Sequence, residues 1–160
     1  MSTQETKQIH DLAWNERLKG QSCLEKGRLD LALTHHMKAL ALFEASKEKV
    51  WVAHTHLALG TVLERAGKIE RAKRRYLEAV ILFEVIGYIE GSVMADTRLA
   101  GIAEMRRDRK GQRFHWNKVL ENLKELKSSS VQDVQAIIDG LENPRAVSFS
   151  ISANHRGAPR

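Results

Sequence analysis

The stretch that decides the fold of this chain is residues 53–88, AHTHLALGTVLERAGKIERAKRRYLEAVILFEVIGY. On both sides of Gly67 its apolar residues recur at the three- and four-residue spacing of an α-helix, which predicts two helices joined by a short turn. Gly60 and Ala72 are small enough to let these helices approach closely. Because such a hairpin has an apolar face on both sides, it needs neighbouring helices to bury them.

A copy of this stretch lies forty residues earlier in the chain. Seven of the identical pairs are Gly20 and Gly60, Gly27 and Gly67, Ala32 and Ala72, Ala39 and Ala79, Leu42 and Leu82, Phe43 and Phe83, and Glu44 and Glu84. A third copy, forty residues later, is weaker, since Ala100 stands in the place of Gly60 and Gln112 in the place of Ala72. Terminal copies of repeat proteins are often atypical. The sequence therefore predicts three stacked helical hairpins.

The positions of these small residues resemble the tetratricopeptide repeat. That family places a small residue midway along its first helix, Gly at the turn, and Ala at two points of its second helix, as at Gly60, Gly67, Ala72 and Ala79. The period here is forty residues rather than the family's usual number of about 34, and the closing proline is missing. These features are similar to the long-repeat branch, as in kinesin light chains and Pins-type G-protein signalling modulators. The resemblance covers about residues 10–127 and implies an all-α fold, a right-handed α-solenoid.

The repeat also predicts where the units begin and end. We expect hairpins over about residues 10–47, 48–88 and 89–127, and a C-terminal capping helix over residues 130–142. The capping helix carries apolar residues such as Val134 and Ile138 on one side only, which is typical of a terminal helix with its other side in water. Residues 1–143 together form the predicted repeat domain.

The residues after the capping helix follow a different pattern. Val147, Phe149 and Ile151 alternate with serines, a period of two that suits an extended strand rather than a helix. We expect residues 144–160 to be a flexible or extended C-terminal tail. The alternative is that this tail docks like a strand in a partner's groove or at a sheet edge.

The composition excludes several classes of protein. Of 160 residues, 42% are hydrophobic and 29% are charged, as in soluble globular proteins. The sequence has no apolar run of the roughly 18 residues that could span a membrane, and its first residues lack the apolar region of a secretory signal. The single cysteine, Cys23, excludes an internal disulfide and fits a reducing compartment. We therefore expect a cytoplasmic protein.

The sequence shows no pattern typical of catalysis or metal binding. It contains no phosphate-binding glycine loop, no nucleophile elbow and no acid–base pair with a supporting third residue. His35 and His36 are adjacent, and His54 and His56 are two apart, so neither pair shares a helix face as ligands four residues apart would. We expect no enzyme activity, no cofactor and no metal site.

The resemblance also implies a binding surface, because in this family the first helix of each hairpin lines a concave groove. The corresponding positions are Trp14, Arg17, Gln21, Leu24 and Glu25, then His54, Leu57, Thr61, Glu64 and Arg65, and finally Met94, Thr97, Gly101, Glu104 and Met105. This mixture of apolar and polar side chains suits an extended or helical peptide, although some of them would instead pack against the cap or the tail. The two-carboxylate clamp of chaperone-binding members is not expected, because the second groove helix has no Asn.

Positive charge is concentrated in the middle of the chain. Residues 64–118 contain thirteen Lys or Arg and eight Asp or Glu, a difference that supplies most of the net charge of +6. The candidate basic surface consists of Arg71, Arg74, Arg75, Arg109, Lys110 and Arg113. A solvated charged face is the simplest interpretation, and binding to RNA or another acidic surface is the alternative. Single-strand binding also needs exposed aromatic residues, but Tyr76, Phe114 and Trp116 fall on the predicted buried stripe.

The function favoured by the sequence is a non-catalytic interaction module, that is, an adaptor, scaffold or regulatory subunit with a protein or peptide partner in its groove. The first alternative is a helical repeat that binds nucleic acid through the basic surface. The second is a scaffold that assembles from copies of itself through the repeat ends or the tail. Monomer and homo-oligomer both remain open.

Overall fold

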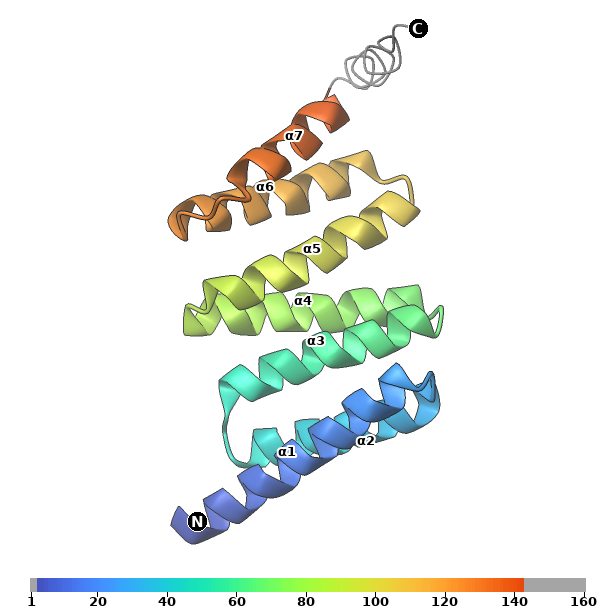
Figure 1. Ribbon diagram of the computed structural model, residues 1–160, viewed down its shortest axis with the longest axis vertical. Coiled ribbons are helices and arrows are strands. Elements are labelled where there is room, and N and C mark those ends of the chain that lie inside the picture. Colours follow the sequence, from blue (N-terminus) through green and yellow to red (C-terminus); the bar gives the residue numbers. More distant parts are fainter. Residues whose placement is uncertain (1–2, 143–160) are drawn as a thin grey trace, which may run out of the picture.

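The structure is a computed structural model that describes residues 3–142, and within this range it contains seven α-helices and no strand (Figure 1). They are α1 (Thr3–Glu25), α2 (Leu29–Ala45), α3 (Lys49–Arg65), α4 (Ile69–Ile86), α5 (Ile89–Met105), α6 (Arg109–Glu125) and α7 (Val131–Glu142). The helices follow one another along the long axis of the molecule, with α1 at one end and α7 at the other. None of the described helices is both long enough and apolar enough to cross a membrane.

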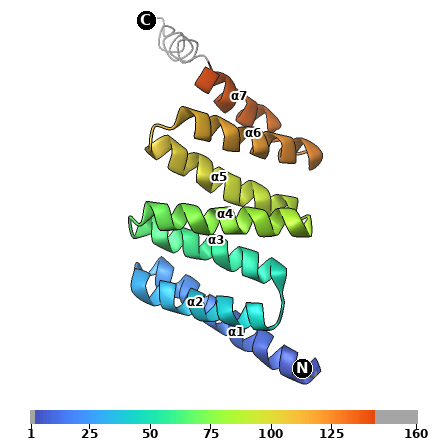
Figure 2. The same cartoon turned by 180° about the vertical axis from the view of Figure 1, so that it is seen from behind.

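Each helix packs mainly against its neighbours in the chain. Helices α1 and α3 lie in front of α2 and α4 in Figure 1 and behind them in Figure 2, which shows the opposite side. Helix α3 also contacts α5, although the two are not consecutive in the chain. Within residues 3–142, the pairs α2 and α4, and α4 and α6, contact each other less than α3 and α5 do. Helices α3 and α5 therefore approach each other more closely than α2 and α4 or α4 and α6 do. This arrangement confirms the predicted all-α helical repeat solenoid.

The six turns between the helices share one backbone geometry. Each contains a residue with a φ angle between 52° and 71°, and these residues recur at every twentieth position: Gly27, Lys47, Gly67, Gly87, Arg107 and Lys127. In the turn after α3, the N–H of Gly67 donates to the carbonyl of Glu64 at 2.9 Å, and the N–H of Lys68 donates to that of Leu63 at 2.8 Å. These bonds satisfy carbonyls at the end of the helix. The junctions between hairpins thus have the same form as the turns within them.

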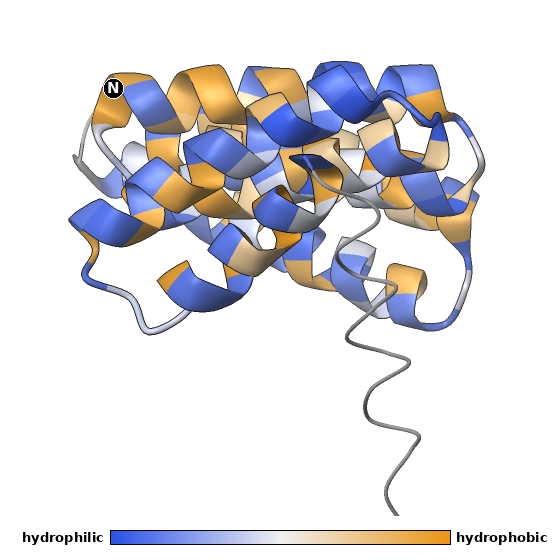
Figure 3. Ribbon diagram, turned by 90° about the horizontal axis from the view of Figure 1, so that it is seen from above, coloured by the Kyte–Doolittle hydropathy of each residue, from blue (hydrophilic) through white to orange (hydrophobic). Residues whose placement is uncertain are grey.

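The core lies between the helices, and aromatic rings fill it where the opposite helix carries glycine. A Cβ atom at Gly60 would lie 2.4 Å from the ring of Tyr76, which is fully buried. A Cβ at Gly20 would lie 2.8 Å from the ring of His36. At the far end, α7 buries Val134 and Ile138 against α6. Viewed along the stack, each helix carries both hydrophobic and hydrophilic residues, as an amphipathic helix in a solenoid must (Figure 3).

The predicted tail lies outside the described residues, and so does its alternation of Val147, Phe149 and Ile151 with serines. The fold that positions the candidate site is therefore that of residues 3–142.

Candidate binding groove

A cavity of about 460 Å³ lies where α1, α3 and α5 face one another, and we call it the groove cavity. Its lining consists of Arg17 from α1, of His54, Leu57, Ala58 and Thr61 from α3, and of Val93, Met94, Thr97 and Arg98 from α5. All of these side chains come from odd-numbered helices, of which α3 and α5 contact each other directly. An occupant of the groove cavity would therefore contact all three hairpins.

Six of the fifteen predicted groove residues line this cavity, namely Arg17, His54, Leu57, Thr61, Met94 and Thr97. Leu24 lies in the core instead, because it is 6% exposed and packs with Ala32 and Val62. Gln21 is exposed and donates to the carboxylate of Glu25 at 2.9 Å. The other predicted residues, which do not line the cavity, are Trp14, Glu25, Glu64, Arg65, Gly101, Glu104 and Met105.

Arg17 is the most constrained side chain of the groove cavity. Its guanidinium carbon lies 4.8 Å from the ring centroid of Trp14 and 5.3 Å from that of Trp51. The two indole rings meet edge to face, with their centroids 4.7 Å apart. Burial lowers the pKa of Arg17, but an arginine in a protein stays charged. These cation–π contacts hold a positive charge in a fixed place at the wall of the cavity.

Within residues 3–142, Arg17 has no carboxylate partner for this charge. Its Nε atom is buried without a hydrogen-bond acceptor, and no carboxylate within residues 3–142 forms an ion pair with the guanidinium. A buried donor that lacks an acceptor costs about 1–3 kcal/mol, and more when the group is charged. The described residues therefore supply no counter-ion for the guanidinium of Arg17.

His54 lies behind Arg17 in a group of aromatic rings. Its ring centroid is 5.5 Å from that of Trp51, 5.0 Å from that of Phe83 and 5.6 Å from that of Tyr88. Burial and the nearby charge of Arg17 lower the pKa of His54. His54 is therefore neutral at pH 7, and it adds a polar but uncharged group to the lining of the groove cavity.

Tyr76 of α4 fixes two side chains of α3. Its hydroxyl group donates to the carboxylate of Glu64 at 2.6 Å and lies 3.4 Å from Oγ1 of Thr61. Burial raises the pKa of Tyr76, with a further contribution from the bond to Glu64, so the phenol keeps its proton. Glu64 is thus held by the core of its own hairpin. Glu64 does not line the groove cavity.

Sequence reasoning missed Ala58, Val93 and Arg98, which also line the cavity. Each of them is adjacent to a predicted groove residue in the sequence, and together they form the edges at which α3 and α5 face each other. The repeat alignment predicts which residues share a face of one helix, but the width of that face depends on the neighbouring helix. The excess of positive charge in residues 64–118 was the only signal that pointed to Arg98.

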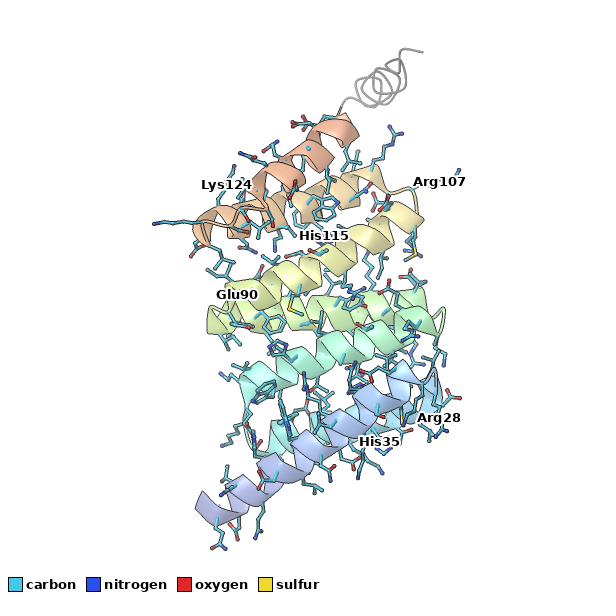
Figure 4. The ribbon with its side chains drawn as sticks, in the orientation of Figure 1. Arg28, His35, Glu90, Arg107, His115 and Lys124 are labelled. Atoms are coloured by element: carbon cyan, nitrogen blue, oxygen red, sulfur yellow. The ribbon has the colours of Figure 1, made fainter. Side chains whose placement is uncertain are left out.

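Three polar pairs lie at corresponding positions of the three hairpins. Oε2 of Glu16 is 2.8 Å from Nδ1 of His35, and Oδ1 of Asp96 is 2.8 Å from Nδ1 of His115, which lies between α5 and α6 (Figure 4). In the second hairpin the pair is His56 and Arg75, 3.3 Å apart. The bond to His35, followed by that to Lys19, lowers the pKa of Glu16. Each pair joins the first helix of a hairpin to the second.

No group of three or more His, Cys, Asp or Glu side chains converges as metal ligands within residues 3–142. The histidines take part in packing instead. His36 is 1% exposed, and both of its ring nitrogens lack a hydrogen-bond partner among the described residues.

The predicted basic surface is partly neutralised by ion pairs. Arg75 pairs with Glu78 at 3.0 Å, and Arg113 pairs with Glu142 at 3.5 Å. The remaining members, Arg71, Arg74, Arg109 and Lys110, are exposed on α4 and α6.

The prediction that Phe114 belongs to the buried stripe was wrong, since its side chain is 57% exposed. Helix α6 packs through Val119, Leu120 and Leu123, and Phe114 does not lie on that stripe. The ammonium group of Lys118 lies 5.7 Å from the centre of its ring. Phe114 also lines a second cavity, of about 530 Å³, together with Lys110, Gly111, Arg113 and Asn117. The outer side of α6 therefore carries an exposed aromatic ring among cations.

Comparison with protein families finds one match to the chain. Residues 11–84 match the family described as "Tetratricopeptide repeat", a range that begins within α1 and ends within α4. No curated protein matches the chain.

Proposed function

Residues 11–84 belong to the tetratricopeptide repeat family, and from this premise we propose that the chain is a non-catalytic adaptor, scaffold or regulatory subunit that holds a peptide segment of a partner protein in the groove cavity. Repeats of this family generally mediate interactions between proteins. The forty-residue period further favours the long-repeat branch of the family.

The observation that supports this proposal most strongly is the position of the groove cavity across three hairpins. Its lining combines aliphatic side chains such as Leu57 and Val93 with polar ones such as Thr61 and Thr97. Because these residues stand on packed helices, the surface exists before a partner binds, and little conformational entropy is lost on binding. An elongated segment with a few anchoring side chains fits such a surface better than a compact small molecule.

Two tryptophan substitutions at alanines test the site. Ala58 lines the groove cavity, whereas Ala41 is exposed on α2, so Ala58→Trp and Ala41→Trp make the same chemical change inside and outside the site. A displayed library of random peptides is selected against the wild-type chain, and the affinity of the selected peptides is measured by calorimetry. We expect Ala58→Trp to weaken their binding at least about tenfold through loss of space, and Ala41→Trp to leave it unchanged.

Circular dichroism confirms that each variant keeps its helical content. Since Ala58 is half-buried, Thr97→Trp serves as a second blocking variant at an exposed residue of the same cavity. Peptides that bind both blocked variants as tightly as the wild type would show that the groove cavity is not the binding site.

A second candidate function is supported by the outer side of α6. An exposed aromatic ring beside a cation that forms no ion pair within residues 3–142, as at Phe114 and Lys110, can stack a base while the cation contacts a phosphate. This candidate predicts that labelled homopolymer RNA binds at low salt, that rising salt weakens the complex, and that Phe114→Ala reduces affinity. Absence of binding at low salt would eliminate it.

A further inference from the structure

The charges at the groove cavity are all of one sign. Arg17 lines it from α1, and Arg98 lines it from α5. Neither guanidinium forms an ion pair with a carboxylate within residues 3–142. No Asp or Glu side chain in this part of the chain lines the groove cavity. Glu64, a carboxylate of the predicted groove face, accepts the hydroxyl hydrogen bond of Tyr76.

Three cations outside the groove cavity are neutralised by ion pairs. Arg75 pairs with Glu78, Lys118 with Glu84, and Arg113 with Glu142 on the even-numbered helices and α7. Arg17, by contrast, is half-buried between two indole rings, where it cannot turn freely into water to complete its hydrogen bonds. A desolvated guanidinium without a counter-ion favours an anionic ligand, and a carboxylate matches its planar donors with two parallel bonds.

The rest of the cavity wall is uncharged, and part of it is apolar. Leu57 and Val93 are aliphatic, and Met94 is 48% exposed, so its flexible thioether can adapt to the shape of an occupant. An occupant must therefore present an apolar side chain close to its negative charge.

We propose that the segment bound in the groove cavity is acidic: an internal stretch of a partner protein in which Asp or Glu side chains flank an aliphatic anchor. Arg17 and Arg98 bind the carboxylates, and Leu57, Val93 and Met94 contact the anchor. The proposal deepens the proposed function of the groove and rests on it. Because side-chain carboxylates satisfy the two arginines, the segment needs no free C-terminus.

Nucleic acid fits this cavity less well than an acidic peptide. Phosphate contacts along a strand need a row of cations, whereas the lining holds two arginines separated by aliphatic residues. Base stacking needs exposed rings, but no aromatic residue other than His54 lines the groove cavity in the described part of the chain.

The test compares peptide selections on charge variants. The same displayed library of random peptides is selected against the wild type, against Arg17→Gln, against Arg98→Gln, and against Arg74→Gln, whose exposed arginine on α4 lies outside the groove cavity. We expect wild type and Arg74→Gln to enrich Asp and Glu beside Leu, Ile, Val or Met. Each groove substitution should weaken the binding of a wild-type-selected peptide by about tenfold to a hundredfold, since it removes charge-assisted hydrogen bonds.

Arg17→Gln also removes packing against Trp14 and Trp51, so its helical content and thermal unfolding are measured alongside. Arg98 is exposed, and Arg98→Gln therefore tests the proposal even where Arg17→Gln disturbs the fold. The affinity of the selected peptides should fall as sodium chloride is raised, with a smaller fall for Arg98→Gln.

The outcomes separate this inference from the function on which it rests. Neutral or basic peptides that bind the wild type and are blocked by Ala58→Trp would overturn the acidic segment and keep the peptide groove. Peptides insensitive to Ala58→Trp would overturn both. A short labelled uridine homopolymer that binds more tightly than any selected peptide, and loses affinity in Arg98→Gln, would replace the acidic peptide by nucleic acid.

Discussion

Gly60 and Gly20 allow their helices to approach closely because they lack a side chain. The ring of Tyr76 occupies the space where a Cβ at Gly60 would stand, and the imidazole of His36 does the same at Gly20. The corresponding residue of the third hairpin is Ala100, so the third hairpin accommodates a methyl group at this contact. The packing role of these small residues could be predicted from the sequence, because their spacing repeats with the period of the fold.

Substituting two helical glycines tests this packing. In Gly60→Ala the new methyl group would overlap the buried ring of Tyr76, and we expect a loss of about 1–3 kcal/mol in the free energy of unfolding. In Gly101→Ala no atom lies within 4 Å of the new Cβ, so the better helix propensity of Ala should add about 0.5–1 kcal/mol. Urea unfolding followed by circular dichroism measures both changes. Equal effects of the two substitutions would contradict the close contact.

His36 makes the stability of the first hairpin dependent on pH. Burial, followed by the charges of Arg17 and His35, lowers its pKa from 6.5 to about 4. Between these values the unfolded chain binds a proton that native His36 does not, so acid favours unfolding. This contribution is complete above pH 6.5 and falls by about 3 kcal/mol as the pH decreases to 4.

The matched variant is His36→Phe, since the corresponding residues Tyr76 and Trp116 are also aromatic. We expect its free energy of unfolding to change less between pH 6.5 and pH 4 than that of the wild type. Identical slopes for the two proteins would show that His36 is not buried in its neutral form. The unpartnered nitrogens of this side chain could not be predicted from sequence, because they depend on the groups that surround the ring.

At the scale of the helices, the turns show a regularity that the sequence only partly reveals. Gly27, Gly67 and Gly87 mark three of the left-handed turn positions, but Lys47, Arg107 and Lys127 adopt the same conformation without being glycine. Tertiary packing imposes the turn there against the preference of the residue. The φ angles of the backbone, and not the residue types, show that all six turns have the same geometry.

Two opposite substitutions test these turns. Arg107→Gly should raise the free energy of unfolding by about 1 kcal/mol, because glycine adopts a φ of 56° without strain. Gly67→Ala should lower it by a similar amount, since a side chain is introduced at a φ of 71°. Thermal unfolding measures both. Destabilisation by Arg107→Gly would mean that the Arg107 side chain makes a stabilising interaction that outweighs the strain of its turn.

The groove cavity and Phe114 show where sequence reasoning at this scale ends. Helical periodicity identifies one face of α3 and one of α5, but the rotation of each helix against its neighbour decides which side chains reach the cavity. Leu24 is consequently covered by Ala32 and Val62, whereas Arg98 lines the cavity. Phe114 is exposed for the same reason, since the packed stripe of α6 passes through other residues.

At the scale of the whole molecule, each hairpin is joined within itself by a polar pair and to its neighbours by apolar contacts. Solenoids of this kind offer a preformed concave surface, and the affinity of a partner depends on a few anchors rather than on area. The fold class was predictable from the forty-residue period, whereas the side of the groove was implied by the resemblance to the tetratricopeptide repeat and stays a prediction. The unpaired arginines were not predictable, since pairing depends on which carboxylates the fold brings close.

The most direct test of the groove is methyl nuclear magnetic resonance with a peptide selected against the wild-type chain. Leu57, Val93 and Met94 have methyl groups at the groove cavity, whereas Ile81 and Val85 of α4 are 60% and 69% exposed and do not line it. We predict that the peptide shifts the resonances of the first set and leaves the second unchanged. Shifts at Ile81 and Val85, with Leu57, Val93 and Met94 unaffected, would contradict binding in the groove.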